Sequence, residues 1–330
     1  MENKIMYDLI IIGSGPAGYV AAIRAGQTGL KTAIIERDTI GGMCLNWGCI
    51  PSKALMESVK LYQKVLNDAT RFGVDGIDKK ALSFNWNKAI KRSDGIVKKL
   101  TGGVEFLLKK NGVDIIKGSA KIVTANSILV NNRLLEAKNT IIATGSSSTK
   151  IENKFDGLVI EPEKLFIERE IPENIVIVGK TPVAVELAQG FNFMGRNTTL
   201  VSDSSGIMPK ADPYISNYIL NKLKKDRVKV VFNKEIANTA GLWKNGMLTL
   251  DSDQIPCDLI INVRDRKGNL IDSDIEIEQS NGYIKTDLNF ETSVKGIFAV
   301  GDVNGMSMFA HVGSAQGLHV VNHINGIESP

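Results

Sequence analysis

The chain has few of the residues that mark a metal centre or a disulfide-stabilised secreted protein. Its 330 residues include three cysteines and three histidines, and the histidines all lie after residue 310. A secreted disulfide framework would need more cysteines. Long apolar runs are also missing. The apolar run near the start, YDLIII, ends after a few residues at a glycine. Such a run is too short to cross a membrane, and no signal-peptide cleavage region follows it.

Charge of one sign is not in excess either. The formal net charge is +4, and no dense basic run or basic amphipathic stretch occurs. We therefore expect no nucleic acid and no membrane as a partner, and a cytoplasmic location. Hydrophobic residues make up 43% and charged residues 23% of the chain, which is ordinary for a soluble globular protein, and the length favours two domains.

The first thirty-six residues contain a glycine-rich turn in a specific context. Segment 7–36 has the pattern of an apolar strand, the turn GSGPAG, an alanine-rich helix and a second strand ending on Glu36. In such a unit Gly13 allows the tight turn, Gly15 lets the backbone approach a pyrophosphate, and Gly18 lets the helix pack on the sheet. Glu36 stands where a carboxylate can hydrogen-bond a ribose hydroxyl. The pattern predicts a dinucleotide-binding unit.

The rest of the chain continues the alternation of strands and helices. Apolar spacing predicts helices over 53–66, 86–110 and 213–225, and short strand-like runs recur between 112 and 145. A second strand–turn–helix–strand pattern starts at 175. We therefore expect an α/β protein with two Rossmann-like nucleotide-binding domains, the second inserted into the first. The expected boundaries are 1–150 and 273–330 for the two parts of the FAD-binding domain, and 151–272 for the inserted NAD(P)-binding-like domain.

Two of the three cysteines lie close together in GGMCLNWGCIPSK, residues 41–53. Three interpretations compete for Cys44 and Cys49: half of a zinc site, two buried structural cysteines, or a redox-active disulfide. No second Cys or His pair is near enough in sequence to complete a zinc site. A pair at the start of a helix, with Pro51 in the first turn, lies where the helix dipole favours the reactive thiolate. The redox interpretation is favoured.

The same stretch resembles the active-site segment of the flavin-dependent pyridine nucleotide-disulfide oxidoreductases, and most closely that of dihydrolipoamide dehydrogenase. The resemblance covers essentially the whole chain. It includes GSGPAG with Glu36, the cysteine motif at 41–53, IIATG ending at Gly145, and GIFAVGD ending at Asp302. It implies bound FAD and a disulfide that passes two electrons to or from the flavin.

The resemblance also implies roles for individual residues. Cys49 would be the thiolate that faces the flavin ring, and Cys44 would exchange with a substrate disulfide. Lys53 would lie near the flavin and form an ion pair with Glu186 of the second module. These four residues are the expected catalytic set, and no metal site is expected.

The expected FAD contacts are carried over in the same way. Asp302 would hydrogen-bond the ribityl chain, and segment 310–317 would cover the pyrimidine side of the flavin. The full expected set is Gly13, Gly15, Pro16, Ala17, Gly18, Glu36, Arg37, Gly42, Met43, Cys44, Cys49, Lys53, Ala120, Ala143, Thr144, Gly145, Gly301, Asp302, Ala310 and His311.

The second module departs from the family pattern at its glycine turn. The segment reads IVIVGKTPVAVELA, so Gly179 is kept but the middle glycine is Thr181, followed by Pro182. A side chain at the middle position would crowd a pyrophosphate, and a proline offers no N–H donor.

Two further nicotinamide-site features are altered. The strand-end acid is replaced by Ser202, with Asp203 beside it, and the later Gly-Arg motif reads VRDRKGN over 263–269. The three changes together make NAD(P)H binding doubtful. A ferredoxin-type electron carrier or a thiol protein is the expected replacement.

The chain ends before the dimer-interface domain of the family, which carries a His-Glu acid/base pair. We therefore expect no family-type dimer, and no match to that pair among His311, His319 and His323. The expected function is that of an FAD-dependent disulfide/dithiol oxidoreductase, acting on a lipoyl or thioredoxin-like protein. Two alternatives stay open: a conventional NAD-linked dihydrolipoamide dehydrogenase and a non-catalytic flavin-binding subunit.

Overall fold

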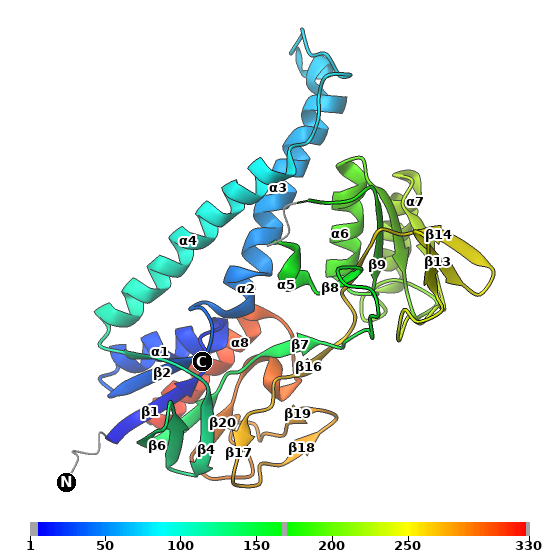
Figure 1. Cartoon of the computed structure of the whole chain (residues 1–330). Coiled ribbons are helices and arrows are strands. Elements are labelled where there is room, and N and C mark those ends of the chain that lie inside the picture. Colours follow the sequence, from blue (N-terminus) through cyan, green and yellow to red (C-terminus); the bar gives the residue numbers. More distant parts are fainter. Residues whose placement is uncertain (1–5, 167–169, 328–330) are drawn as a thin grey trace. The chain divides into compact units, whose positions relative to one another are not determined.

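The computed structural model describes residues 6–166 and 170–327. The chain divides into two compact units, each built from separate stretches of sequence (Figure 1). Unit 1 comprises 1–49, 97–147 and 266–330, and unit 2 comprises 50–96 and 148–265.

Unit 1 is built on a sheet of eight strands among the described residues. Seven lie in the order β17–β4–β5–β6–β1–β2–β3, and β20 pairs with β6. The bounds are β1 Met6–Ile12, β2 Thr32–Glu36, β3 Asp114–Lys117, β4 Ala120–Thr124, β5 Ser127–Val130, β6 Arg133–Ile142, β17 Asp272–Ser273 and β20 Ile297–Ala299. Strand β1 is parallel to both neighbours, with Ile11 opposite Ile34 and Ile141. Such a central strand is covered on both faces, which explains its continuous apolar run.

Helices α1 (Pro16–Gln27) and α8 (Ala310–Ile324) lie side by side in this unit, although they come from opposite ends of the chain (Figure 1). The close approach depends on small residues, because a Cβ at Gly317 would lie 2.6 Å from the Ala17 carbonyl oxygen. The other elements of unit 1 are short: α2 Gly42–Asn46, β7 Ser146–Ser148, β16 Arg266–Gly268, β18 Gln279–Ser280, β19 Tyr283–Ile284 and η2 Gly301–Asn304.

Unit 2 contains a sheet in the order β11–β10–β9–β15–β8, and all its strand pairs are parallel. Ile177 in its central strand lies opposite Leu200 and Ile261. The bounds are β8 Val159–Ile160, β9 Asn174–Val178, β10 Asn197–Val201, β11 Lys229–Val231 and β15 Leu259–Asn262, with helices α5 Pro162–Leu165, α6 Pro182–Phe193 and α7 Pro213–Lys225. A small antiparallel sheet follows, formed by β12 Trp243–Lys244, β13 Met247–Leu250 and β14 Asp253–Pro256. The sheet of unit 2 is parallel, and that of unit 1 is parallel except for the antiparallel pairs β4–β5 and β5–β6. These sheets with their flanking helices confirm the predicted α/β class.

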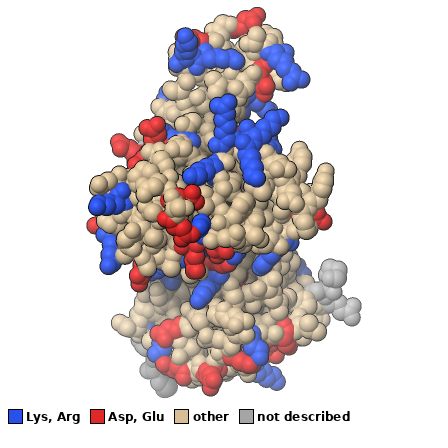
Figure 2. Space-filling view, turned by 90° about the vertical axis from the view of Figure 1, so that its right-hand side faces the viewer, with Lys and Arg blue, Asp and Glu red and all other residues tan. Residues whose placement is uncertain are grey.

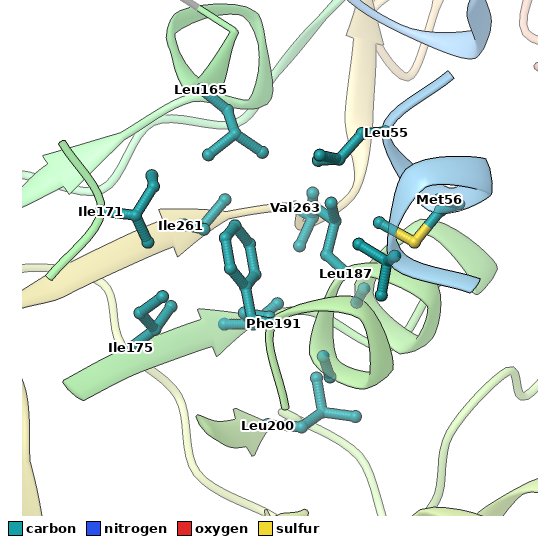
Figure 3. Packing of buried hydrophobic residues seen from close by; sticks show 14 of the residues in the cluster. Leu55, Met56, Leu165, Ile171, Ile175, Leu187, Phe191, Leu200, Ile261 and Val263 are labelled. Carbon is teal, nitrogen blue, oxygen red and sulfur yellow. The ribbon is translucent and has the colours of Figure 1, made fainter. Parts of the chain in front are cut away.

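Two long helices link stretches of sequence that belong to different units: α3 (Cys49–Asn67) and α4 (Trp86–Lys110), with the short turn η1 (Ala69–Phe72) between them. Figure 3 shows Leu55 and Met56 of α3 packed with Leu187 and Phe191 of α6. This packing places 50–96 in unit 2, whereas the sequence division assigned that stretch to the first segment, 1–150. The apolar face of α3 packs into the core of unit 2. The sequence pattern reveals that this face is apolar but not which elements it packs against.

Neither sign of charge covers the surface seen in Figure 2, where acidic and basic side chains lie close to one another. Among residues 6–166 and 170–327, none of the helices combines the length and the apolar character that crossing a bilayer requires.

Candidate functional site

The first glycine turn connects β1 to α1 and is shaped by close backbone contacts. Gly13 has φ +103°, and a Cβ there would lie 2.3 Å from the carbonyl oxygen of Ala143. A Cβ at Gly18 would lie 1.9 Å from the carbonyl oxygen of Gly13. At Gly15, by contrast, no heavy atom lies within 4 Å of the position that a Cβ would take. The outer two glycines of the turn are therefore packed against backbone atoms, whereas the middle glycine, Gly15, faces open space.

The N-terminus of α1 has Gly15 as its N-cap, and no side chain caps it. The first N–H groups of a helix lack partners within the helix and carry the positive end of its dipole. An uncapped helix start behind an open glycine is a suitable place for a phosphate group.

Glu36 holds this turn from the end of β2. Its carboxylate accepts hydrogen bonds from the backbone N–H of Ser14 at 2.9 Å and from the Ser14 hydroxyl at 2.6 Å. Its other oxygen accepts from the N–H of Asp38 at 2.7 Å. The side chain of Glu36 is buried, and a buried carboxylate needs such donors. Glu36 thus positions the glycine turn, and its expected contact with a ribose stays a prediction.

The cysteine pair lies directly against the first turn. Cys44 lies in α2, Cys49 begins α3, and the two form a disulfide with their Cα atoms 4.7 Å apart. The predicted disulfide is therefore present. The N–H of Gly41 donates to the Ser14 carbonyl at 3.0 Å, and a Cβ at Gly42 would lie 2.6 Å from the Gly15 Cα. The disulfide segment and the turn are packed with almost no space between them.

Asp302 follows β20 and ends a short chain of polar contacts. Its Oδ2 accepts from the Ser146 hydroxyl at 2.6 Å. The same hydroxyl accepts from the Arg266 Nε at 2.9 Å, and the Arg266 guanidinium also donates to the Ser146 carbonyl at 2.5 Å. Arg266 therefore fixes Ser146, and Ser146 orients the Asp302 carboxylate.

Two amides hold the neighbouring loops. Asn269 donates from its side chain to the Thr144 carbonyl at 3.0 Å and from its backbone to the Gly145 carbonyl at 2.9 Å. Gln316 of α8 accepts from the Gly301 N–H at 2.7 Å and is buried. Sequence reasoning missed Ser14, Ser146, Arg266, Asn269 and Gln316. Ser14 and Ser146 adjoin recognised motif glycines, and that position is the one signal that could have found them.

The remaining predicted contacts are distributed over unit 1. Arg37 is exposed and pairs with Asp38 at 3.7 Å. His311 is exposed at the start of α8, where its ring stacks on Phe309. The others lie on element ends or turns around the same sheet: Pro16 and Ala17 in α1, Met43 in α2, Ala120 at the start of β4, Ala143 after β6, and Ala310 at the start of α8.

Lys53 and Glu186 form the expected ion pair within unit 2. The Lys53 ammonium lies 2.7 Å and 2.8 Å from the two Glu186 carboxylate oxygens. The polypeptide leaves 65% of the Lys53 side chain and 30% of the Glu186 side chain exposed. Protein atoms alone therefore do not desolvate the pair, and such a pair contributes about 0–1 kcal/mol to stability.

The second glycine turn connects β9 to α6 and differs from the first at its middle position. Gly179 has φ +154°, and a Cβ there would lie 2.5 Å from the Val263 carbonyl oxygen. Thr181 is the N-cap of α6, and its hydroxyl accepts from the N–H of Ala184 at 3.3 Å. Pro182 occupies the start of α6, as Pro16 does in α1. Pro182 therefore does not distinguish the two turns, contrary to the sequence argument, whereas Thr181 does.

Charged side chains fill the rest of the second turn. The Lys180 ammonium lies 2.9 Å from an Asp203 oxygen and 3.6 Å from an Asp265 oxygen. The hydrogen bond to Asp203 raises the pKa of the Lys180 ammonium, so the lysine stays charged. Ser202, at the strand end, is fully buried and donates to the Gly206 carbonyl at 3.0 Å. Both nearby acids are thus engaged with the turn's own lysine.

Comparison with known proteins identifies relatives over nearly the whole chain. The family model described as "Pyridine nucleotide-disulphide oxidoreductase" matches residues 7–317. A protein named dihydrolipoyl dehydrogenase from Acholeplasma laidlawii is 38% identical over 327 residues, which cover 96% of this chain and 96% of that relative. A dihydrolipoyl dehydrogenase from Chlorobaculum tepidum is 33% identical, and the match covers 97% of this chain and 71% of that relative.

Solved structures share the fold. The HOCl-induced flavoprotein disulfide reductase RclA from Escherichia coli superimposes with a TM-score of 0.85 at 22% sequence identity. The match covers 98% of this chain and 72% of that protein. At this level of identity the likeness concerns the fold alone, and it supports the α/β fold.

Proposed function

We propose that this chain, which belongs to the pyridine nucleotide-disulphide oxidoreductase family, is an FAD-dependent enzyme in which Cys44 and Cys49 exchange electrons with a lipoyl-type dithiol. We further propose that its second electron partner is not NAD(P)H. One observation supports the proposal about NAD(P)H: the side chains of Thr181 and Lys180 occupy the second glycine turn, where Thr181 accepts from the Ala184 N–H and Lys180 pairs with Asp203.

The residues of unit 1 fit FAD. The uncapped start of α1 and the open position at Gly15 would receive the pyrophosphate. Glu36 and Asp302 would bind the ribose and the ribityl chain, because each carboxylate is held in place by Ser14 or Ser146. FAD, when bound, supplies the capacity to take up or release two electrons.

The thiol chemistry follows from the position of the two cysteines. A substrate thiolate would attack the Cys44 sulfur, forming a mixed disulfide and releasing Cys49 as a thiolate. The second substrate thiol would then attack the substrate sulfur of this mixed disulfide and release Cys44. One dithiol becomes a disulfide, the protein disulfide becomes two thiols, and two electrons and two protons are transferred. Cys49 begins α3, where the helix N-terminus favours the thiolate.

The substrate class rests on the relatives. Proteins named dihydrolipoyl dehydrogenase are 33–38% identical to this chain, so a dihydrolipoyl group is the first candidate dithiol. A thioredoxin-like protein offers the same chemistry. The electrons would leave to one-electron carriers of the ferredoxin type or to another dithiol protein.

The doubt about NAD(P)H rests on competition at the second turn. A pyrophosphate at the start of α6 would have to displace the Thr181 hydroxyl from the Ala184 N–H. A ribose would find Ser202 buried and Asp203 paired with Lys180. A lost hydrogen bond to a charged group costs about 1.5–3 kcal/mol, which is roughly tenfold to a hundredfold in affinity.

An anaerobic titration tests the proposal. The FAD-loaded chain is mixed in turn with NADH, NADPH and dihydrolipoamide while the flavin absorbance is followed by stopped flow. We expect dihydrolipoamide to bleach the flavin quickly and both nucleotides to do so slowly or not at all. Full reduction by millimolar NADH within a second would replace this proposal with an NAD-linked dihydrolipoamide dehydrogenase. No bleaching by any reductant, dithionite excepted, would favour a non-catalytic flavin-binding subunit.

The two cysteine roles are tested by a matched pair of variants. Cys44→Ser leaves the Cys49 thiolate beside the oxidised flavin, and we expect a long-wavelength absorbance band. Cys49→Ser should lack that band. Identical spectra for the two variants would show that the roles are assigned wrongly.

A further inference from the structure

We propose that His319 and His323 of α8, together with Asn289, form a binding site for a divalent transition-metal ion of the zinc class. The chain has three histidines in all, and two of them lie one helical turn apart in this helix. The redox chemistry proposed above uses neither. The site lies within unit 1.

The spacing of the two histidines suits chelation. Residues four apart on a helix lie on the same face, so both side chains of the pair reach the same side of α8. Their rings are nearly parallel, with an interplanar angle of 8° and centroids 6.4 Å apart. Two imidazoles on successive turns of one helix are a metal-binding arrangement, and imidazole nitrogen is a preferred ligand for zinc, copper and nickel.

A third ligand atom is already next to the pair. The Nε2 of His319 lies 3.2 Å from the Oδ1 of Asn289. A metal ion could take the place of the proton between these two atoms, with His323 joining from the next turn after a change of side-chain rotamer. The described residues contain no group of three or more His, Cys, Asp or Glu side chains suited to a metal, so the site would consist of two imidazoles and one amide oxygen.

The surroundings orient the rings and favour a cation. The rings of Phe290 and His319 meet edge-on, with their centroids 5.5 Å apart, and the centroids of the Phe298 and His323 rings are 6.2 Å apart. His323 lies in the last turn of α8, where the negative end of the helix dipole attracts positive charge. The carboxylate of Asp287 accepts the backbone N–H of Asn289 at 2.8 Å and adds negative charge to the same turn. His319 is half-buried and His323 is exposed, so an ion can reach them.

The protein offers few competing ligands when its disulfide is intact. Cys44 and Cys49 are joined to each other, and the thiol of Cys257 is fully buried. Burial also raises the pKa of that thiol to about 12, which disfavours the thiolate that a metal would need. His311 lies at the start of the same helix, where its ring stacks on Phe309. It is therefore a natural internal control.

The test is a titration of the oxidised full chain with Zn²⁺, followed by the three histidine Hε1 signals in proton NMR and by calorimetry. We expect one ion per chain, with the signals of His319 and His323 shifting together and that of His311 unchanged. His323→Gln should weaken Zn²⁺ binding on the order of tenfold or more, because even an outer-sphere partner of a metal site is worth that much. His311→Gln should leave Zn²⁺ binding within about twofold.

Equal shifts of all three signals, or no saturation up to millimolar Zn²⁺, would overturn the proposal. If His323→Gln disturbs folding, Asn289→Ala serves instead, because it keeps both imidazoles and removes the oxygen. A weaker Zn²⁺ affinity in Asn289→Ala supports the three-ligand site. An unchanged affinity in both Asn289→Ala and His323→Gln contradicts it.

Discussion

The two glycine turns of this protein share one backbone and differ in what they can hold. The N–H of Gly13 donates to the strand carbonyl of Ile35 at 2.8 Å, and that of Gly179 donates to Val201 at 2.9 Å. Each glycine has a positive φ and presses against the end of a neighbouring strand. In both units, the first glycine of the turn and its contacts with the sheet therefore determine the backbone path between strand and helix.

The difference lies in the next two positions. In the first turn Ser14 is tied to Glu36, and Gly15 leaves open space. In the second turn Lys180 is held by two acids, and Thr181 caps the helix with its own hydroxyl. A nucleotide-binding fold and a nucleotide-binding site are therefore separate properties, because side chains can take the contacts that a ligand would make.

The largest effect is expected from Gly13→Ala. The added Cβ would meet the Ala143 carbonyl oxygen at 2.3 Å, in a backbone conformation that disfavours any side chain. We expect loss of FAD binding, measured by flavin fluorescence after gel filtration. The matched variant Gly179→Ala should lower the melting temperature but retain FAD. If both variants lose FAD equally, the turns do not have separate roles.

A smaller effect is expected from Glu36→Gln. The amide would turn an N–H₂ toward one of the donors that now face the carboxylate: the Ser14 N–H, the Ser14 hydroxyl or the Asp38 N–H. A loss of about 1.5–3 kcal/mol predicts a roughly tenfold to hundredfold weaker FAD affinity. Asp203→Asn, which changes the acid next to the corresponding strand end in the second turn, should leave FAD affinity unchanged.

The comparison can also be reversed. Lys180→Ser combined with Thr181→Gly gives the second turn the serine and glycine of the first, and it releases Asp203 and Asp265 from the lysine. We expect flavin reduction by sub-saturating NADH to become about tenfold faster, since one recovered hydrogen bond to a charged group is worth about 1.5 kcal/mol, which is roughly tenfold in affinity. An unchanged rate in stopped flow would mean that other parts of unit 2 limit the nucleotide.

The smallest effect is expected from Lys53→Met, which removes the cation beside Glu186 near the second turn. The exposure of Lys53 limits the contribution of this pair to stability to about 1 kcal/mol or less. Thermal unfolding should therefore shift by only a few degrees, which calorimetry can measure. A much larger loss would show that the pair is desolvated in the folded protein.

Much of this architecture could be predicted from sequence, because it rests on local patterns. The strands at 7–12 and 175–179, the helix at 213–225 and the cysteine pair all follow from periodicity or motif. The length of β6, which begins at Arg133, does not follow from the sequence, because its first residues, RLLEAK, are too polar to look like a strand. Those residues pair on one side with β5, a neighbour that local periodicity does not reveal.

The polar contacts of the site were less predictable. Arg266 meets Ser146 across 120 residues of sequence, and Asp302 meets the same serine across 156 residues. Nothing local in either segment indicates such partners. The role of the Thr181 side chain could not be predicted either, because a threonine at this position can crowd a ligand or cap its own helix. The structure shows that it caps α6.

The contact between Gly42 and Gly15 bears on how this protein can change in evolution. Because the two backbones touch, a longer loop or a larger residue at 41–42 would move the sulfur atoms away from the glycine turn. The side chains of Arg37–Thr39, a few residues earlier, are exposed, although the Asp38 N–H donates to Glu36. We therefore expect side-chain drift to be tolerated at 37–39, and insertions only where that backbone hydrogen bond is kept. The spacing from Gly41 to Cys49 should resist change even in relatives that act on different thiols.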